Sequence, residues 1–121
     1  MNRFHWSVLA CLALPLAPAR AADGGDVFDQ ECAECHSVAK PPRNKKGASL
    51  VGMMGRKAAT VDGVQYSDAL KASGIVWTRE TMDAYVKNPK AVVPGGGTMK
   101  YDGLPDGAAR AALVDFLDQQ K

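Results

Sequence analysis

The sequence predicts an all-α fold, and three features of its pattern indicate this class. Apolar residues recur at helical spacing in several short segments, and residues with helix-capping side chains precede those segments. No stretch shows the apolar–polar alternation of a strand. The 121 residues suffice for one small domain without repeats, and its modest core favours support from a cofactor or covalent staple.

Residues 1–21 match the pattern of a secretory signal peptide. Arg3 supplies positive charge, and residues 8–17 form an apolar run of signal-peptide length. Ala19 and Ala21 then place small side chains at the two positions that a signal peptidase requires. We therefore predict cleavage after Ala21.

Residues 22–121 remain as one domain, which we predict to be periplasmic. No stable membrane insertion is expected, because the apolar run is shorter than the roughly 20 residues that span a bilayer. The pattern supports two alternatives less well: an uncleaved anchor, and a lipoprotein processed at Cys11, before which almost no apolar run would remain.

The charge balance argues against nucleic-acid binding. Two of the 15 basic residues, Arg3 and Arg20, lie in the predicted signal, so the remaining basic residues equal the 13 acidic residues in number. The charges are unevenly distributed, which gives the folded domain a dipole. Acidic residues at its ends are Asp23, Asp26, Asp29, Glu31, Glu34, Asp115 and Asp118, and basic residues between them are Lys40, Arg43, Lys45, Lys46, Arg56, Lys57, Lys87, Lys90 and Lys100.

The first half of the domain is expected to hold one helix and one long loop. The helix covers residues 26–34, with Val27 and Phe28 on its apolar side. Residues 37–64 form the loop, because prolines and glycines interrupt them repeatedly. A loop of this length in a small domain commonly wraps around another group.

The second half is expected to hold three helices. Ser67 caps a helix through residue 72, and Thr78 caps the next, which Asn88 and Pro89 end. Asp106 or the proline before it opens the last helix. The apolar stripes are Met82, Tyr85 and Val86 on the middle helix, and Ala109, Ala112, Leu113, Phe116 and Leu117 on the last.

The sequence Cys32-Ala33-Glu34-Cys35-His36 carries the chemistry. C-x-x-C-H is the signature of covalent haem attachment. Two thiols at this spacing reach both vinyl groups of a porphyrin, and the following histidine then lies beneath the iron as its proximal ligand. A thioredoxin-like motif would need a βαβ setting, and a structural zinc site would need more ligands. We therefore predict one covalently bound haem c.

Four methionines of the domain are candidates for the sixth iron ligand. Met82 lies on a helical stripe and is expected in the core, whereas Met53 and Met54 follow a glycine and could pack against the ring. Met99 lies in a glycine-rich loop over residues 93–106 that can approach the opposite haem face. We favour Met99.

The chain resembles class I cytochromes c, especially the mitochondrial type and bacterial cytochrome c2. The resemblance extends from about residue 24 to residue 116, and its motifs are collinear between His36 and Pro89. The matching segments are residues 47–57 (GASLVGMMGRK), 66–69 (YSDA), 74–77 (GIVW), 85–89 (YVKNP), 94–99 (PGGGTM) and 103–104 (GL), together with Gly24, Phe28 and Phe116.

The resemblance implies a cytochrome c fold, with short helices and long loops wrapped around one haem, and a role for each matching site residue. The implied residues are Cys32 and Cys35 for attachment; His36 and Met99 for the iron; Arg56, Tyr66 and Trp77 for hydrogen bonds to the propionates; Tyr85 near the methionine sulfur; and Thr98 near a propionate.

Two departures from the family pattern concern the iron ligands. Ala48 replaces the proline whose carbonyl accepts a hydrogen bond from the proximal histidine, so the backbone contact remains available from a less stiff loop. The loop before Met99 has an extra glycine and lacks the lysine before the methionine, so ordering it loses more entropy. We therefore expect weaker Met99–iron ligation than is typical of the family.

The expected function is one-electron transfer between proteins, with no substrate transformed and hence no enzymatic activity. The basic residues named above would rim an exposed haem edge and steer encounter with an acidic patch on a reductase, dehydrogenase or terminal oxidase. Alternatives are a haem subunit of a stable exported oxidoreductase complex, and an enzyme or gas sensor with open iron. A cytochrome c′-type bundle is disfavoured, because its haem motif lies near the C-terminus.

Overall fold

The computed structural model describes residues 12–16, 22–95 and 97–121. This part of the chain confirms the all-α prediction, since its β-structure is limited to one isolated bridge between Lys57 and Val76. Its helices are α1 (Gly24–Glu31), α2 (Asp68–Ala72), α3 (Arg79–Lys87), α4 (Pro89–Val92) and α5 (Gly107–Asp118). The predicted signal-peptide features fall mainly on residues 1–11 and 17–21, outside the described residues.

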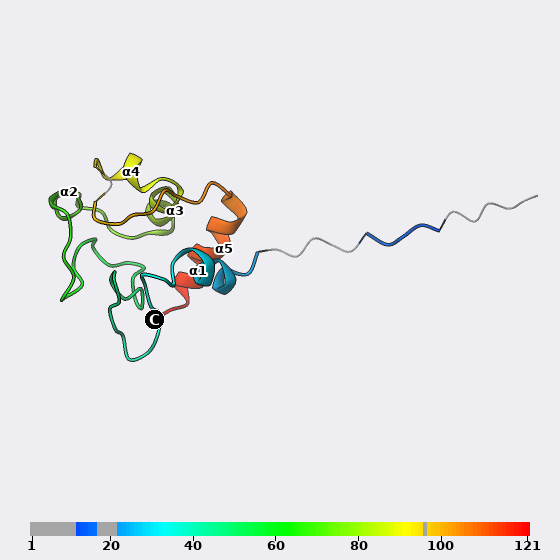
Figure 1. Ribbon diagram of the computed structural model, residues 1–121, viewed down its shortest axis with the longest axis horizontal. Helices are drawn as coiled ribbons and strands as arrows, with labels where there is room; N and C mark the ends of the chain where they lie inside the picture. The colour runs from blue at the N-terminus through cyan, green and yellow to red at the C-terminus, as the bar shows by residue number, and fades with distance from the viewer. Residues whose placement is uncertain (1–11, 17–21, 96) are drawn as a thin grey trace, which may run out of the picture.

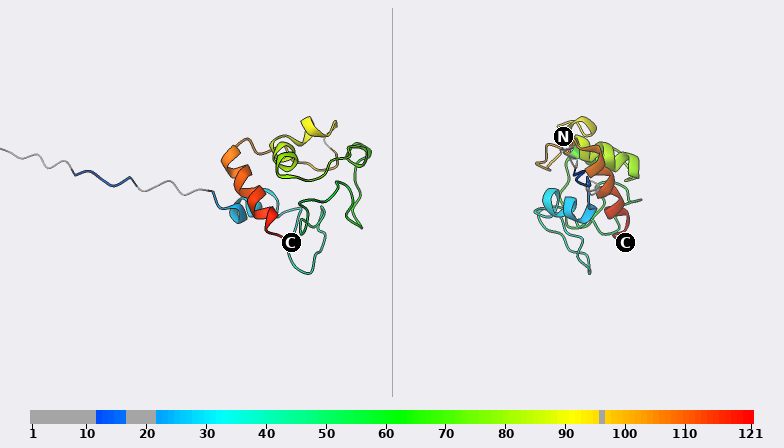
Figure 2. Two further views of the ribbon diagram at one scale, coloured as in Figure 1. Left: turned by 180° about the vertical axis from the view of Figure 1, so that it is seen from behind. Right: turned by 90° about the vertical axis from the view of Figure 1, so that its right-hand side faces the viewer.

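The loop over residues 37–64 lies on a different side of the molecule from α3 and α4, whereas the loop over residues 93–106 runs beside these two helices (Figure 1). Figures 1 and 2 show α3 and α4 at one side, the loop over residues 37–64 at the other, and α1 packed against α5 between them. None of the helices in the described ranges is long and apolar enough to cross a bilayer.

Helix α1 begins and ends earlier than its predicted bounds of 26–34. The Asp23 side chain accepts hydrogen bonds from the backbone N–H groups of Gly25 and Asp26, at 2.8 and 3.3 Å, so the helix begins at Gly24. It ends at Glu31, and the haem-attachment motif follows as a turn. The predicted bounds are wrong by two residues at the start, where Asp23 caps the helix, and by three at the end, where the turn begins at Cys32.

The contact between α1 and α5 depends on a glycine. A Cβ atom at Gly24 would lie 2.1 Å from the backbone oxygen of Ala112, so only a residue without a side chain allows this approach. The rings of Phe28 and Phe116 pack beside it, with centroids 5.4 Å apart. This crossing holds the two ends of the domain together next to the Cys32 segment.

The caps predicted for the middle helices are confirmed, and α4 was not predicted. The Ser67 hydroxyl accepts from the N–H of Leu70 at 3.1 Å, and Thr78 and Thr81 form a reciprocal capping box at the start of α3. Asn88 ends α3 as expected, but its side chain also caps α4, whose first residue is Pro89. A proline that stops one helix therefore starts another.

The last helix has its predicted start, but its buried residues differ from those expected, since Ala112 and Phe116 are only half-buried. Asp106 caps α5, and Leu113 and Leu117 are buried as predicted. Arg110 and Val114 are also buried, although neither was predicted to be. The core combines residues from α1, α3, α5 and the loops: Val27, Phe28, Ala48, Met53, Ala58, Trp77, Met82, Ala109, Leu113, Val114 and Leu117.

Candidate functional site

The turn after α1 carries the two cysteines and the histidine on one short segment. The N–H groups of Cys35 and His36 both donate to the carbonyl of Cys32, at 3.1 and 2.9 Å. This tight turn keeps Cys32, Cys35 and His36 close together in the fold. Both cysteines are half-buried free thiols, so neither is paired with another cysteine of the described chain.

The surroundings of Cys32 favour a neutral sulfur. Burial, and secondarily the carboxylate of Glu31, raise the pKa of the Cys32 thiol to about 11. An apolar environment that disfavours a thiolate suits a thioether, which carries no charge. The residue therefore fits covalent attachment to a vinyl group.

His36 is oriented by the loop that follows the motif. Its Nδ1 lies 2.7 Å from the carbonyl oxygen of Ala48, so that Nδ1 carries the proton and donates. The Nε2 lone pair is then available to a metal. Gly47 permits this arrangement, because a Cβ there would lie 2.5 Å from Cε1 of His36. Alanine at position 48 thus retains the backbone contact expected at that position.

The four candidate methionines differ in burial. Met53 and Met82 are each 6% exposed and belong to the core, as expected for Met82. Met54 packs at the edge of the core. Met99 is half-buried, in the loop between α4 and α5.

Three of the expected polar residues lie close together: Arg56 and Trp77 in loops, and Tyr85 on α3. Trp77 and Arg56 are joined by backbone hydrogen bonding, with the N–H of Trp77 donating to the Arg56 carbonyl at 2.9 Å. The rings of Trp77 and Tyr85 pack with centroids 5.0 Å apart. Burial raises the pKa of Tyr85 above its ordinary value, so its hydroxyl stays protonated at neutral pH.

The remaining polar candidates are less closely joined. The Tyr66 hydroxyl accepts from the N–H of Val61 at 3.3 Å. Thr98 is exposed, and its side chain makes no hydrogen bond to a described residue. Arg56 lines an open pocket of about 450 Å³, and its guanidinium likewise has no hydrogen-bond or ion-pair partner within the described ranges.

The Trp77 indole N–H indicates that a polar group fits beside it. Trp77 is 6% exposed, and the indole has no hydrogen-bond partner among the residues described. Yet every fully buried polar side-chain atom in the described part of the chain has a partner. The indole N–H must therefore face accessible space, where an acceptor such as a carboxylate can reach it.

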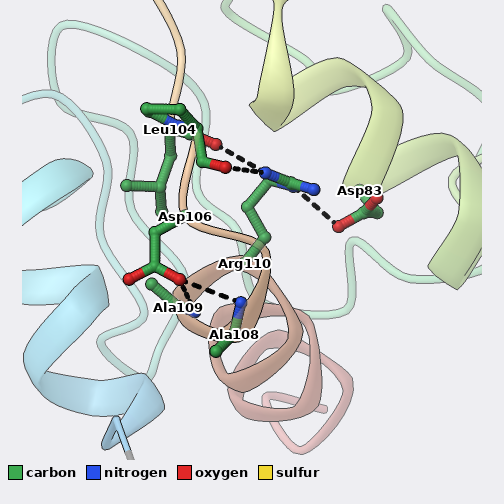
Figure 3. Close-up of polar contacts among 7 residues, drawn as sticks. Asp83, Leu104, Asp106, Ala108, Ala109 and Arg110 are labelled. Carbon is green, nitrogen blue, oxygen red and sulfur yellow. Dashed lines mark hydrogen bonds and ion pairs between the residues drawn. The ribbon is translucent and has the colours of Figure 1, made fainter.

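Arg110 was missed by sequence reasoning and anchors the end of the Met99 loop. It lies on α5, where Nε donates to Asp83 of α3 at 2.9 Å (Figure 3). Its Nη1 donates to the carbonyls of Leu104 and Pro105, both at 2.9 Å. A single arginine on an otherwise apolar helical face was the signal that could have revealed it.

Two other missed residues join segments that are distant in sequence. The Asn44 amide donates to the carbonyl of Asp62 at 3.0 Å and accepts from the N–H of Ser49 at 2.9 Å, which ties the loop around His36 to the following loop. The Tyr101 hydroxyl donates to Glu31 at 2.6 Å. No local pattern around Asn44 or Tyr101 indicates these contacts.

The geometry defines a class of protein: a small helical domain with a thiol–thiol–imidazole attachment segment and a loop methionine. A family model for cytochrome c matches residues 21–121. Cytochrome c2 of Blastochloris viridis is 41% identical over 116 residues, which cover 96% of this chain and 90% of the relative. Cytochrome c of Stellaria longipes is 39% identical over 97 residues (80% and 89%), and cytochrome c type-1 of Ascaris suum is 41% identical over 97 residues (80% and 85%).

The chain belongs to the cytochrome c family. The resemblance to class I cytochromes c and the expected fold are thereby confirmed. Proteins of this family carry one covalently attached haem c and transfer single electrons between redox partners. This chain is accordingly a mono-haem electron carrier.

Proposed function

We propose that this chain carries single electrons between two exported redox proteins, with its haem held by Cys32 and Cys35 and its iron bound by His36 and Met99. The orientation of the His36 imidazole is the observation that supports this most strongly. Its Nδ1 is occupied by the Ala48 carbonyl at 2.7 Å, beside two free thiols, which leaves Nε2 for a metal. The bound haem supplies reversible one-electron oxidation and reduction of its iron.

The burial of the methionines supports Met99 as the second axial ligand. Met53 and Met82 are packed in the core, so either would have to leave it to reach a metal. Met99 lies in a loop and can present its thioether with little loss of packing. Thioether ligation opposite an imidazole raises the reduction potential, which suits a carrier.

Three side chains are proposed to bind the haem carboxylates. The Trp77 N–H faces accessible space, the Arg56 guanidinium lines a pocket, and the Tyr66 hydroxyl retains its own proton to donate. Thr98 is proposed as a further hydrogen-bond donor. The Tyr85 hydroxyl, which stays protonated in its partly buried position, is proposed to donate toward the Met99 sulfur.

A paired substitution tests the axial ligand. Ferric Met99→Ala is expected to lose the absorption band that arises from sulfur–iron ligation, whereas Met54→Ala, which also removes a half-buried methionine, should retain it. A band that survives in Met99→Ala would overturn the assignment. The mass of the mature protein tests attachment, since it should exceed the polypeptide mass by one haem and should lose that increment when both cysteines are replaced.

Export and the cleavage site of the signal peptide can be tested on the same protein. The signal peptide is proposed to end at Ala21, so the mature chain recovered from the periplasm should begin at Ala22. An N-terminus at Met1, or a lipid on Cys11, would contradict this.

The partner surface is proposed to be basic. Lys87 is the last residue of α3, and Lys100 directly follows Met99. Both are exposed, and neither has an ion-pair partner in the part of the chain that the structure describes. By contrast, Lys46 is paired with Glu34 at 3.1 Å and Lys90 with Asp102 at 3.6 Å. The first two lysines are therefore available for an acidic patch on a partner.

A charge-matched control makes this surface testable. Lys87→Gln and Lys100→Gln should each slow electron transfer to the physiological partner at low salt by several-fold, whereas Lys121→Gln removes the same charge at the C-terminus and should not. Equal effects of all three, or rates that do not fall as salt rises, would refute a local basic docking surface.

Two alternative roles have distinct signatures. A haem subunit of a stable complex would co-purify with a large partner, whereas a free carrier would not. An enzyme or sensor with open iron would lack the sulfur–iron band and bind added ligands without displacing a protein group. We propose an electron carrier without enzymatic activity. An enzyme or sensor would need a vacant coordination position on the iron, whereas the Met99 loop offers a thioether for that position.

A further inference from the structure

The loop that carries Met99 is anchored unequally on its two sides. On the side before Met99, Gly95 and Gly97 adopt φ angles of +80° and +61°, which side chains disfavour. Residues 94, 95, 97 and 98 make no hydrogen bond to another described residue. Among the described residues, this arm is therefore anchored by hydrogen bonding only at its start, where the buried Val93 donates its N–H to the Pro89 carbonyl at 2.9 Å.

The arm after Met99 is bound to three helices. Its Leu104 N–H donates to the carbonyl of Val86 on α3 at 2.9 Å, and Arg110 of α5 donates to the carbonyls at the loop's end. Lys90 of α4 pairs with Asp102 at 3.6 Å, but both groups are solvent-exposed and such pairs contribute little. These contacts restrain the end of the loop, several residues from Met99.

One contact lies closer to Met99 and reaches across the molecule. The Tyr101 hydroxyl donates to Oε2 of Glu31 at 2.6 Å, between residues that are 70 positions apart. Both residues are half-buried, and a hydrogen bond to a carboxylate is short and strong. Glu31 is the last residue of α1 and directly precedes Cys32, so the bond joins the Met99 loop to the attachment segment.

We propose that the Tyr101–Glu31 hydrogen bond is a latch that keeps Met99 on the iron. This inference rests on the proposed ligation by Met99. Two residues of extended chain span at most about 7 Å, so holding Tyr101 confines Met99 to a small region. The described residues 94, 95, 97 and 98 make no hydrogen bond that could provide this restraint, whereas Glu31 directly precedes Cys32, which is proposed to be covalently joined to the haem. Tyr101 is thus a positioning residue, which acts through Met99.

The proposal predicts how readily an added ligand displaces Met99. In the ferric holoprotein, imidazole can bind the iron only after Met99 leaves, so its binding rate at saturating imidazole reports opening of the loop. Tyr101→Phe removes only the hydroxyl and should raise this limiting rate about tenfold, as expected for loss of one charge-assisted hydrogen bond. Glu31→Gln should raise it less, because the amide oxygen still accepts, and combining it with Tyr101→Phe should add nothing.

A neighbouring carboxylate provides the control. Glu34 is exposed, lies in the attachment segment and pairs with Lys46 at 3.1 Å, so Glu34→Gln removes the same charge without touching the loop. Its imidazole rate should equal that of the wild type. Global unfolding by guanidinium is measured in parallel, since a merely structural contact would lower the free energy of unfolding while leaving the rate unchanged.

The outcomes separate the latch from the ligand assignment. An unchanged imidazole rate in Tyr101→Phe, or an equal increase in Glu34→Gln, would overturn the latch. A wild-type protein without a sulfur–iron band would instead refute Met99 ligation itself. A raised rate in Tyr101→Phe with the band still present in both proteins would establish the latch.

Discussion

Replacing Gly24 by alanine should separate α1 from α5, and the adjacent Gly25 offers a matched control. A Cβ at Gly24 would lie 2.1 Å from the Ala112 carbonyl oxygen and 2.7 Å from Cβ of Phe116. Neither atom is the end of a flexible side chain, so no rotamer change relieves the clash. At Gly25 the nearest neighbours would be an Asp23 oxygen at 3.1 Å and a Phe116 ring carbon at 3.5 Å.

The size of the effect follows from these contacts. Non-bonded carbon atoms pack at about 3.5–4.0 Å, so α1 must retreat by more than about 1 Å from α5. Overpacking of this kind costs about 1–3 kcal/mol. Because the retreat also loosens the contact between Phe28 and Phe116, we expect Gly24→Ala to lose about 3 kcal/mol of unfolding free energy. Gly25→Ala should change it by less than about 1 kcal/mol, since better helix propensity offsets mild crowding.

Guanidinium unfolding of the two ferric holoproteins, followed by circular dichroism, measures this difference. The comparison is direct because both variants add one methyl group to the same turn of the same helix. A loss below about 1 kcal/mol in Gly24→Ala, or equal losses in both variants, would show that the close approach does not control the packing of α1 on α5.

Three further predictions concern the site. Gly47→Ala should displace the His36 ring, because the new Cβ at position 47 would lie 2.5 Å from Cε1 of His36. We expect this variant to destabilise the holoprotein by about 2 kcal/mol and to shift its reduction potential. An unchanged potential would contradict this. Arg110→Met should cost about 3 kcal/mol, and a double-mutant cycle with Asp83→Asn should show coupling of about 1 kcal/mol; additive losses would exclude a direct contribution from the ion pair. The sulfur–iron band of the ferric protein should disappear at milder alkaline pH than is typical of the family, because the loop before Met99 is rich in glycine; a band as robust as the family norm would refute weak ligation.

Local chemistry explains where prediction from the sequence succeeded. Ser67 and Thr78 are predicted as helix caps, and Asp106 or Pro105 as the start of the last helix. The side chains of Ser67, Thr78 and Asp106 each accept a hydrogen bond from the first turn of the helix that follows. A cap depends on residues at most three positions away, so its signal lies within the local sequence. The same holds for the turn from Cys32 to His36, whose geometry follows from contiguous residues.

Prediction failed where a residue has two local roles or a distant partner. Pro89 was read as a helix stop, although it also opens α4, because a proline is compatible with the first position of a helix. Arg110 was overlooked, since only the folded chain brings Asp83 and the end of the Met99 loop to it. A charged residue on an apolar helical face indicates a buried polar contact, but only the folded chain shows which groups it contacts.

The sequence by itself determined the helical class, the pentapeptide that attaches the haem and the family, because each depends on residues that are adjacent or regularly spaced. Only the tertiary structure decided which atoms contact one another. The Ala48 carbonyl accepts a hydrogen bond from His36, the Ala112 carbonyl lies close to Gly24, and the Glu31 carboxylate accepts a hydrogen bond from the Tyr101 hydroxyl. Contacts of this kind join segments whose separation along the chain carries no information about their distance in space. They form when burial of the shared core packs those segments together.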